Sequence, residues 1–213
     1  MISRLYPILQ GSDVPTRGKS REDLLRRLLA ELLSAGVTLL QYRHKMGDEA
    51  EVLADAAVMR EAGPAGKCTL ILNDFAGLVT RVGFDGVHVG QEDMTPELAR
   101  AAIGVDGILG LSTHNAEQVV AANLTSADYL AIGPVFATTS KTDADPVVGL
   151  EGVRRARALT KKPLVAIGGI TLENCAEVME AGADSIAVIS SLFADASGKP
   201  PGKIASDFFA KLR

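Results

Sequence analysis

The stretch LVAIGGITLENCAEVMEAGADSIAVI, residues 164–189, contains one complete strand–helix–strand unit. Leu164–Ile167 and Ser185–Ile189 are short apolar runs, which are typical of parallel strands that are covered on both faces. Between them, residues 171–181 carry apolar side chains at helical spacing. Gly182 follows directly, at a position where glycine commonly ends a helix. The stretch therefore predicts two parallel strands joined by a helix.

The same alternation extends from this unit to both ends of the chain. The expected strands are Leu5–Leu9, Thr38–Tyr42, Thr69–Leu72, Gly86–Val89, Ile108–Leu111, Tyr129–Ile132, Leu164–Ile167 and Ser185–Ile189. The expected helices are Arg21–Ala35, Asp48–Ala62, Thr95–Ile103, Asn115–Asn123, Leu150–Leu159, Thr171–Ala181 and a last helix from Ile204. Eight strands in 213 residues favour a single (β/α)8 TIM barrel of the α/β class over an open doubly wound sheet, which usually has fewer strands. We expect one domain over residues 1–213, with an active site at the C-terminal ends of the strands.

Composition restricts the class of partner. A net charge of -4 and an aromatic content of 4% argue against nucleic acid binding. The first ten residues lack the apolar segment of a secretory signal, and no apolar run is long enough to span a bilayer. Cys68 and Cys175 fall in apolar segments, which favours buried thiols over a disulfide. We therefore expect a cytoplasmic monomer or small homo-oligomer that binds small molecules and neither nucleic acid nor membrane.

Polar residues gather after the predicted strands, where barrel enzymes hold their active sites. After the second strand, Gln41, Arg43 and Lys45 share one face under strand periodicity, and they present an amide and two cations. A solvated strand end is the alternative for these residues. His88 lies inside a strand and is predicted to be a packed core residue. His114 either faces the pocket or begins a helix, and neither histidine is assigned as a general base.

Two carboxylates follow the third and fourth strands. Asp74 and Asp93 offer hard oxygen ligands on adjacent strand ends, which suits Mg²⁺ bridging to a substrate phosphate. Each also has a structural alternative, since Asp74 could cap a helix and Asp93 could stabilise a turn. With Arg43 and Lys45 one strand away, the pair predicts a site for a highly charged leaving group such as pyrophosphate.

The loops after the last three strands predict a second anion site. Residues 133–141 form a loop that is rich in hydroxyl groups and ends in lysine, and such a loop either closes over a phosphate or is simply polar. Gly168 and Gly169 would let backbone amides approach a phosphate after the seventh strand, although a tight turn also requires glycine there. Ser190 and Ser191 follow the eighth strand, and the loops after strands seven and eight form the phosphate site of many barrels.

Together these motifs resemble the thiamine phosphate synthase family, over strands two to eight. The motifs are Gln41-Tyr42-Arg43-His44-Lys45, Leu72-Asn73-Asp74, GVHVGQED at 86–93, Gly133-Pro134-Val135-Phe136, Ser140-Lys141 and AIGGI at 166–170. The resemblance implies a transferase of thiamine biosynthesis. Its substrates would be 4-amino-2-methyl-5-(diphosphooxymethyl)pyrimidine and a thiazole phosphate, or the 2-carboxy form of the latter. Its products would be thiamine phosphate and pyrophosphate, formed by Mg²⁺-assisted dissociative substitution without a nucleophilic side chain.

The resemblance also implies a role for each matching residue. The pyrimidine diphosphate would contact Gln41, Arg43, Lys45, Asn73, Ser112 and Lys141, of which Arg43, Ser112 and Lys141 would be catalytic. The thiazole phosphate would contact Thr138, Ser140, Gly169, Ile189 and Ser190, and Mg²⁺ would bind Asp74 and Asp93. Two residues depart from the family pattern: His44 replaces a glutamate, and Ser140 replaces a threonine. Strand alternation is expected to turn His44 away from the phosphate face, and serine keeps the hydroxyl group.

Two other functions fit parts of the pattern. A thiazole tautomerase of the same superfamily would bind thiazole phosphate but no diphosphate, so it would have no use for the set Arg43, Lys45, Asn73, Asp74, Asp93 and Lys141. A non-catalytic, phosphate-binding regulatory barrel would equally have no use for a metal site. The complete set of cations and carboxylates favours the synthase over both.

Overall fold

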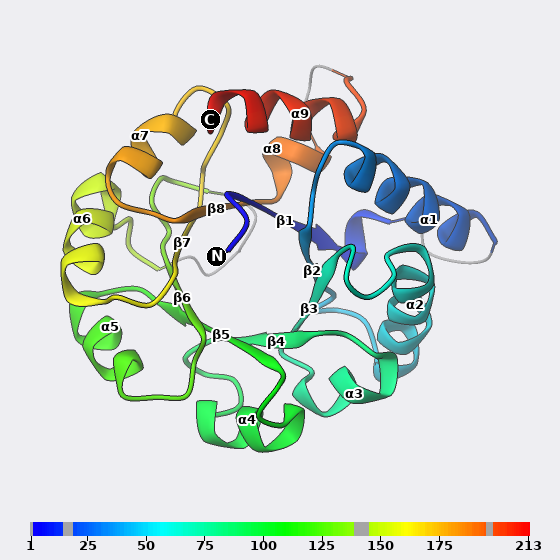
Figure 1. Cartoon of the computed structure of the whole chain (residues 1–213), viewed down its shortest axis with the longest axis horizontal. Helices are drawn as coiled ribbons and strands as arrows, with labels where there is room; N and C mark the ends of the chain where they lie inside the picture. Colours follow the sequence, from blue (N-terminus) through cyan, green and yellow to red (C-terminus); the bar gives the residue numbers. More distant parts are fainter. Residues whose placement is uncertain (1, 15–18, 139–144, 195–197) are drawn as a thin grey trace.

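In the computed structural model, eight parallel strands close into a barrel, with strands adjacent in sequence also adjacent in space (Figure 1). The structure describes residues 2–14, 19–138, 145–194 and 198–213. The strands are β1 (Leu5–Gln10), β2 (Leu39–Arg43), β3 (Thr69–Asn73), β4 (Gly86–Val89), β5 (Ile108–Thr113), β6 (Tyr129–Ile132), β7 (Leu164–Ile167) and β8 (Ser185–Val188). Because β1 pairs with β8, the sheet has no edge. The predicted (β/α)8 barrel is therefore confirmed, and the alternative of an open doubly wound sheet is excluded.

Helices surround the ring of strands (Figure 1). They are α1 (Lys19–Ser34), α2 (Glu49–Ala62), α3 (Val79–Val82), α4 (Pro96–Ile103), α5 (Ala116–Asn123), α6 (Gly149–Leu159), α7 (Cys175–Glu180), α8 (Ser190–Phe193) and α9 (Pro201–Lys211). Two 3-10 turns, η1 (Gly11–Asp13) and η2 (Ala76–Leu78), follow β1 and β3. None of the helices in the described part of the chain is both long and apolar enough to cross a membrane.

Several element boundaries differ from the sequence-based prediction. The helix expected from Thr171 begins at Cys175, because Asn174 Oδ1 accepts the Thr171 N–H at 2.8 Å and closes a turn first. The last helix begins at Pro201 instead of Ile204, and the short helices α3 and α8 were not predicted. Gly63 follows α2 with a φ of -115°, outside the left-handed region in which glycine commonly ends a helix.

The strands separate two apolar cores. The inner core lies inside the barrel and consists of Tyr6, Ile8, Leu39, Ile71, Tyr129, Ala131, Val165 and Ala187. The outer core lies between the strands and the helices, and it includes both cysteines, Cys68 and Cys175, as buried free thiols. Burial raises the pKa of the Cys68 thiol to about 11, so this thiol stays protonated at neutral pH. Burial on both faces explains why the strand sequences are almost continuously apolar.

Three aspartates stand directly before even-numbered strands and hold neighbouring elements together. Asp85, Asp128 and Asp184 precede β4, β6 and β8. Each Oδ2 accepts the backbone N–H of a leucine in the preceding strand, at 2.7 Å from Leu70, 2.7 Å from Leu109 and 2.8 Å from Leu164. Each aspartate also forms an ion pair with an arginine of the helix that precedes the leucine's strand. The partners are Arg60 of α2 at 2.5 Å, Arg100 of α4 at 2.6 Å and Arg157 of α6 at 2.7 Å. We call these three arrangements the Asp clamps; they lie at the N-terminal ends of the strands.

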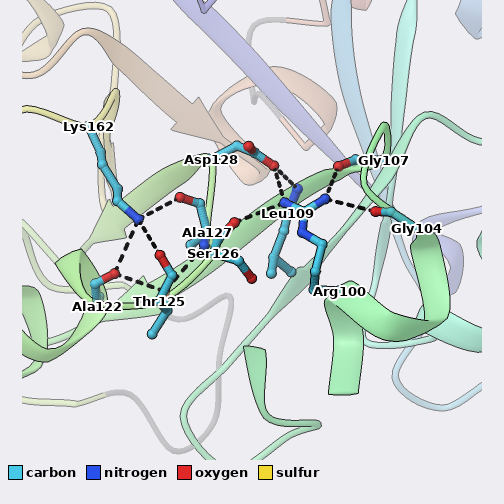
Figure 2. A network of polar contacts seen from close by, with 10 residues as sticks. All are labelled: Arg100, Gly104, Gly107, Leu109, Ala122, Thr125, Ser126, Ala127, Asp128 and Lys162. Atoms are coloured by element: carbon cyan, nitrogen blue, oxygen red, sulfur yellow. Dashed lines mark hydrogen bonds and ion pairs between the residues drawn. The ribbon is translucent and has the colours of Figure 1, made fainter. Parts of the chain in front are cut away.

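Figure 2 shows the clamp at Asp128 together with its surroundings. Arg100 donates to the backbone carbonyls of Gly104 and Gly107, so one guanidinium holds the turn that leads into β5. Beside it, Lys162 Nζ donates to the carbonyls of Thr125 at 2.8 Å and Ala127 at 2.7 Å. These carbonyls follow α5 and have no helical partner, so the ammonium group satisfies them.

The position before β2 has no Asp clamp. Thr38 stands there in place of an aspartate. The two chain ends are joined nearby, because the Arg4 guanidinium donates to the Leu212 carbonyl. The repeating pattern of clamps is therefore interrupted between β1 and β2.

We expect Asp128→Asn to lower the free energy of unfolding by about 1 kcal/mol, since the amide loses the ion pair with Arg100 in a half-exposed site. Asp128→Ala should cost about 2 kcal/mol, because the Leu109 N–H also loses its acceptor. Urea denaturation of both variants measures these differences. The exposed Asp106 offers a matched control, and an Asp128→Asn effect no larger than that of Asp106→Asn would contradict the role of the clamp.

Candidate functional site

A cavity of about 800 Å³ opens at the C-terminal ends of the strands. Its walls contain every predicted site residue within the described part of the chain, namely Gln41, Arg43, Lys45, Asn73, Asp74, Asp93, Ser112, Thr138, Gly169, Ile189 and Ser190. Ser140 and Lys141 lie outside the described residues. The structure therefore brings together side chains that are up to 149 positions apart in the sequence, from Gln41 to Ser190.

The cationic wall of the cavity comes from β2 and the residues after it. Arg43 is half-buried, and its Nη1 donates to Gln10 Oε1 at 2.7 Å, which fixes the guanidinium from β1. Burial lowers the pKa of Arg43, while the nearby carboxylates Asp74 and Asp93 oppose that shift. Lys45 Nζ lies 3.9 Å from Asp74 Oδ2. Gln10 gives no signal in the sequence, because its partner is on the neighbouring strand.

His44 lies outside this wall, as strand alternation predicts. Its ring packs against the edge of Tyr42, with ring centroids 6.2 Å apart, and it does not line the cavity. A Cβ atom added at Gly11 or Gly47 would lie 2.4 Å or 2.5 Å from this ring. The two glycines therefore provide the space for His44, and this departure from the family pattern leaves the cavity unchanged.

The two carboxylates of the cavity lie close to each other. Burial, followed by a hydrogen bond with the Asp93 side chain, raises the pKa of Asp74 to about 7. Asp74 is also the one non-glycine residue in the described ranges with a positive φ, at 67°. Its side chain does not cap η2, whereas Asp93 Oδ2 does accept the Gly90 N–H at 2.8 Å, so the alternative of a turn-stabilising role is real for Asp93.

This pair fits a bound divalent cation. Two close carboxylates repel each other when both are ionised, and a cation between them would remove that repulsion. No group of three or more His, Cys, Asp or Glu side chains arranged to hold a metal occurs among the residues that the structure describes. A cation here would have to complete its shell with water or ligand oxygens, which is the usual behaviour of Mg²⁺.

The opposite side of the cavity is formed mainly by backbone. Gly168 and Gly169 have φ values of 102° and 63°, in the left-handed region. A Cβ atom at Gly168 would lie 2.5 Å from Pro134 Cβ, and one at Gly169 would lie 2.5 Å from the Ala137 carbonyl oxygen. Glycine is therefore required where the segment after β7 meets the segment after β6, and a small, backbone-lined anion site fits this side.

Five side chains, four of them buried, form a continuous hydrogen-bonded chain at the bottom of the cavity. Gln41 Nε2 donates to the Tyr6 hydroxyl at 3.0 Å, and the Tyr6 and Tyr129 hydroxyls are 2.9 Å apart. The Tyr129 hydroxyl is 3.0 Å from His88 Nδ1, and His88 Nε2 is 2.8 Å from Ser112 Oγ. We call this chain the relay. His88 is a packed core residue as predicted, but the roles of Tyr6 and Tyr129 gave no signal in the sequence.

His114 reaches the cavity from the end of β5. Its Nδ1 is 2.7 Å from the Gly133 carbonyl oxygen and 3.3 Å from Asp145 Oδ2. Of the two positions open to it in the sequence, the structure shows the one that faces the pocket. These contacts join the end of β5 to Gly133, directly after β6, and to Asp145, shortly before α6.

The geometry thus offers a wall of charged side chains, a separate backbone-lined end and a buried polar chain between strands. Known proteins are similar to this chain over most of its length. The family model described as thiamine monophosphate synthase matches residues 5–192. A thiamine-phosphate synthase of Koribacter versatilis is 53% identical over 188 residues, which cover 88% of this chain and 86% of the relative.

Further similarity comes from a second sequence and from a solved structure. A thiamine-phosphate synthase of Chloroflexus aurantiacus is 42% identical over 181 residues, covering 85% of this chain and 83% of the relative. The structure of thiamine phosphate pyrophosphorylase from Pyrococcus furiosus superposes with a TM-score of 0.83 and 30% identity, over 98% of this chain and 95% of that chain. The chain therefore belongs to the thiamine monophosphate synthase family, a family of transferases.

Proposed function

We propose that this protein is a thiamine phosphate synthase. It joins 4-amino-2-methyl-5-(diphosphooxymethyl)pyrimidine to a thiazole phosphate, or to its 2-carboxy form, and releases pyrophosphate. The observation that carries the proposal is the position of Arg43, Lys45, Asp74 and Asp93 on one wall of the cavity that also contains the glycine-lined end. The names of the relatives and of the similar solved structure support the same activity.

The charged wall accommodates the pyrimidine diphosphate. Arg43 and Lys45 bind diphosphate oxygens, and Gln10 keeps the Arg43 guanidinium in place for that contact. Asn73 is the last residue of β3 and lines the same cavity, where its amide reaches the same group. Lys141, outside the described residues, is assigned to the diphosphate by the family resemblance alone. Gln41 and Ser112 stand deeper in the cavity and contact the pyrimidine ring.

Asp74 and Asp93 would hold Mg²⁺. When bound, the ion would neutralise charge on the pyrophosphate leaving group. The protein itself would hold the diphosphate with two cations, so that its departure does not require a separate acid. Stabilisation of the leaving group by the ion and the two cations fits a dissociative substitution. In such a reaction the aminopyrimidine delocalises the positive charge that remains on its methylene carbon.

The backbone-lined end accommodates the thiazole phosphate. Gly169, Ile189 and Ser190 present mainly backbone groups, and Thr138 adds a hydroxyl group from the segment after β6. Ser140, which lies outside the described residues, is assigned to the same phosphate by resemblance. Binding at this end would place the thiazole nitrogen toward the pyrimidine methylene carbon, and positioning of this kind can supply most of the rate enhancement.

The thiazole tautomerase remains the second candidate. It would use the backbone-lined end, but it would leave Arg43, Lys45 and the close carboxylates Asp74 and Asp93 without a ligand. Burial and the neighbouring Asp93 raise the pKa of Asp74, and such a carboxylate is costly to keep in a site without a ligand. The charged wall therefore favours the synthase.

The synthase assignment predicts Mg²⁺-dependent pyrophosphate release only when both heterocycles are present. Asp93→Ala should lower kcat/KM at least about 100-fold, because a ligand of the ion is lost, which corresponds to about 3 kcal/mol of barrier. A coupled pyrophosphate assay with and without excess chelator measures both effects, with Asp106→Asn as the control. Isomerisation of the thiazole without pyrophosphate release would instead identify a tautomerase.

Asp74 should reduce the stability of the metal-free protein. Its folded pKa lies above its ordinary value of 3.8, so the folded state keeps a proton that the unfolded state has released, and stability falls as the pH rises from about 4 to 7. Asp74→Asn should therefore raise the unfolding free energy at pH 7.5 in chelator, on the order of 1 kcal/mol. Thermal unfolding at several pH values measures this gain.

Mg²⁺ should reverse the order of stability of the wild type and Asp74→Asn. The ion stabilises the wild type by binding only its folded state, and Asp74→Asn should lose this response. Asp128→Asn, at the other end of the barrel, should keep the response in full. A Tm of Asp74→Asn that rises with Mg²⁺ as much as that of the wild type would exclude Asp74 as a ligand.

A further inference from the structure

The relay crosses the interior of the barrel and ends on two groups of the cavity. It runs from Gln41 on β2 through Tyr6 on β1, Tyr129 on β6 and His88 on β4 to Ser112 on β5. Gln41, Tyr6, Tyr129 and His88 are buried, with exposed fractions of 2%, 1%, 3% and 8%. Water therefore has little access, and the five groups must satisfy one another.

The distances fit either direction of donation at the Tyr6–Tyr129 and Tyr129–His88 contacts, and donation from Gln41 favours one of them. Gln41 Nε2 donates to the Tyr6 oxygen, so the single hydrogen of Tyr6 is free to bind the Tyr129 oxygen. Tyr129 in turn has only His88 Nδ1 as an acceptor. A neutral imidazole whose Nδ1 accepts carries its proton on Nε2, which then donates to Ser112 Oγ.

His88 is neutral in this arrangement for a physical reason. It is only 8% exposed, and both of its ring nitrogens face uncharged hydroxyl groups, those of Tyr129 and Ser112. With one ring proton present, the direction set at Gln41 decides on which nitrogen that proton resides. A neutral ring also places no positive charge beside a substrate that becomes cationic during the reaction.

The backbone of β5 leaves room for the central part of the relay. A Cβ atom at Gly110 would lie 2.3 Å from the Tyr129 hydroxyl oxygen and 2.4 Å from His88 Nδ1. Any other residue at this inward position would displace the hydroxyl or the ring. Gly110 therefore keeps Tyr129 and His88 in hydrogen-bonding contact.

We propose that Tyr6, Tyr129 and His88 are positioning residues that fix Ser112 as a hydrogen-bond donor to a ring nitrogen of the aminopyrimidine. Since Ser112 Oγ accepts from His88 Nε2, its own hydroxyl hydrogen is free to point into the cavity. The ring nitrogens of the pyrimidine are acceptors, so this polarity matches them. The inference rests on the proposed function for the identity of the ring, whereas the direction of the relay is a property of the free protein.

The direction can be tested without substrate by ¹⁵N NMR of histidine-labelled protein. The chain has 3 histidines, and the His88 signals are assigned by their loss in His88→Asn. We expect the Nε2–H tautomer in the wild type at pH 8. Gln41→Glu replaces the donor with an acceptor, so it should reverse the relay and convert His88 to the Nδ1–H form.

Two variants complete this experiment. Tyr129→Phe removes the group that donates to Nδ1 and should release His88 into a mixture of tautomers, which keeps the test decisive if Gln41→Glu does not fold. Tyr42→Phe also removes a buried tyrosine hydroxyl, one that bonds Asp55 outside the barrel interior, and should leave the tautomer unchanged. An Nδ1–H tautomer in the wild type overturns the proposed direction, whatever the enzyme assay shows.

Kinetics then test whether the relay acts through Ser112. Ser112→Ala and Tyr129→Phe should each raise KM for the pyrimidine diphosphate by about tenfold and leave KM for the thiazole phosphate unchanged. The double variant should be no worse than Ser112→Ala alone, because both changes remove the same contact. Additive losses, or an equal rise in both KM values, would overturn the positioning role, while inactivity of the wild type would refute the proposed function and not the direction of the relay.

Discussion

In a closed barrel every second side chain of a strand must point into the interior, and this alternation governs both the core and the cavity. On β2 it sends Gln41 and Arg43 inward and turns Tyr42 outward, and His44, just beyond the strand, likewise lies outside the cavity. The same alternation places Tyr6 and Tyr129 in the inner core, where their side chains are almost fully buried. Polar groups inside the barrel can therefore persist only as a connected chain, and the relay is that chain.

The two ends of the barrel have different energetic roles. At the N-terminal ends the Asp clamps oppose each aspartate with an arginine and a backbone N–H, so their charges are balanced. At the C-terminal ends Asp74 takes a left-handed backbone conformation and lies against a second carboxylate, so strain and repulsion accumulate there. Strain of this kind persists only when the surrounding structure holds it in place. The stabilising contacts at the N-terminal ends of the strands thus compensate for the destabilising arrangement of Asp74 and Asp93 at the C-terminal ends, which suits a ligand.

Sequence patterns predicted the eight strands, the barrel and the residues that line the cavity, because apolar runs and polar strand ends are local signals. They failed where the determining partner is distant or specific to one turn. Asn174 delays α7 through a side-chain hydrogen bond, and Gln10 reaches Arg43 from another strand. The relay links five strands, and no local pattern marks a tyrosine whose partner lies across the barrel. The roles of the site residues, and the contribution of Ser140 and Lys141, stay predictions from resemblance.

The cavity holds its two proposed ligands by different means, and this difference has a consequence for the order of events. The wall of Arg43, Lys45, Asp74 and Asp93 relies on charged side chains. Gln10 holds the Arg43 guanidinium, whereas the exposed Lys45 and the close pair Asp74 and Asp93 respond to the charge that is placed between them. The end at Gly168 and Gly169 relies on backbone that is already fixed by contacts with Pro134 and Ala137. The relay fixes the floor between them before either ligand arrives. A preformed floor and one preformed end leave Lys45 and the two carboxylates as the part that must adjust, so we expect binding of the proposed diphosphate, and not of the proposed thiazole phosphate, to carry most of the reorganisation.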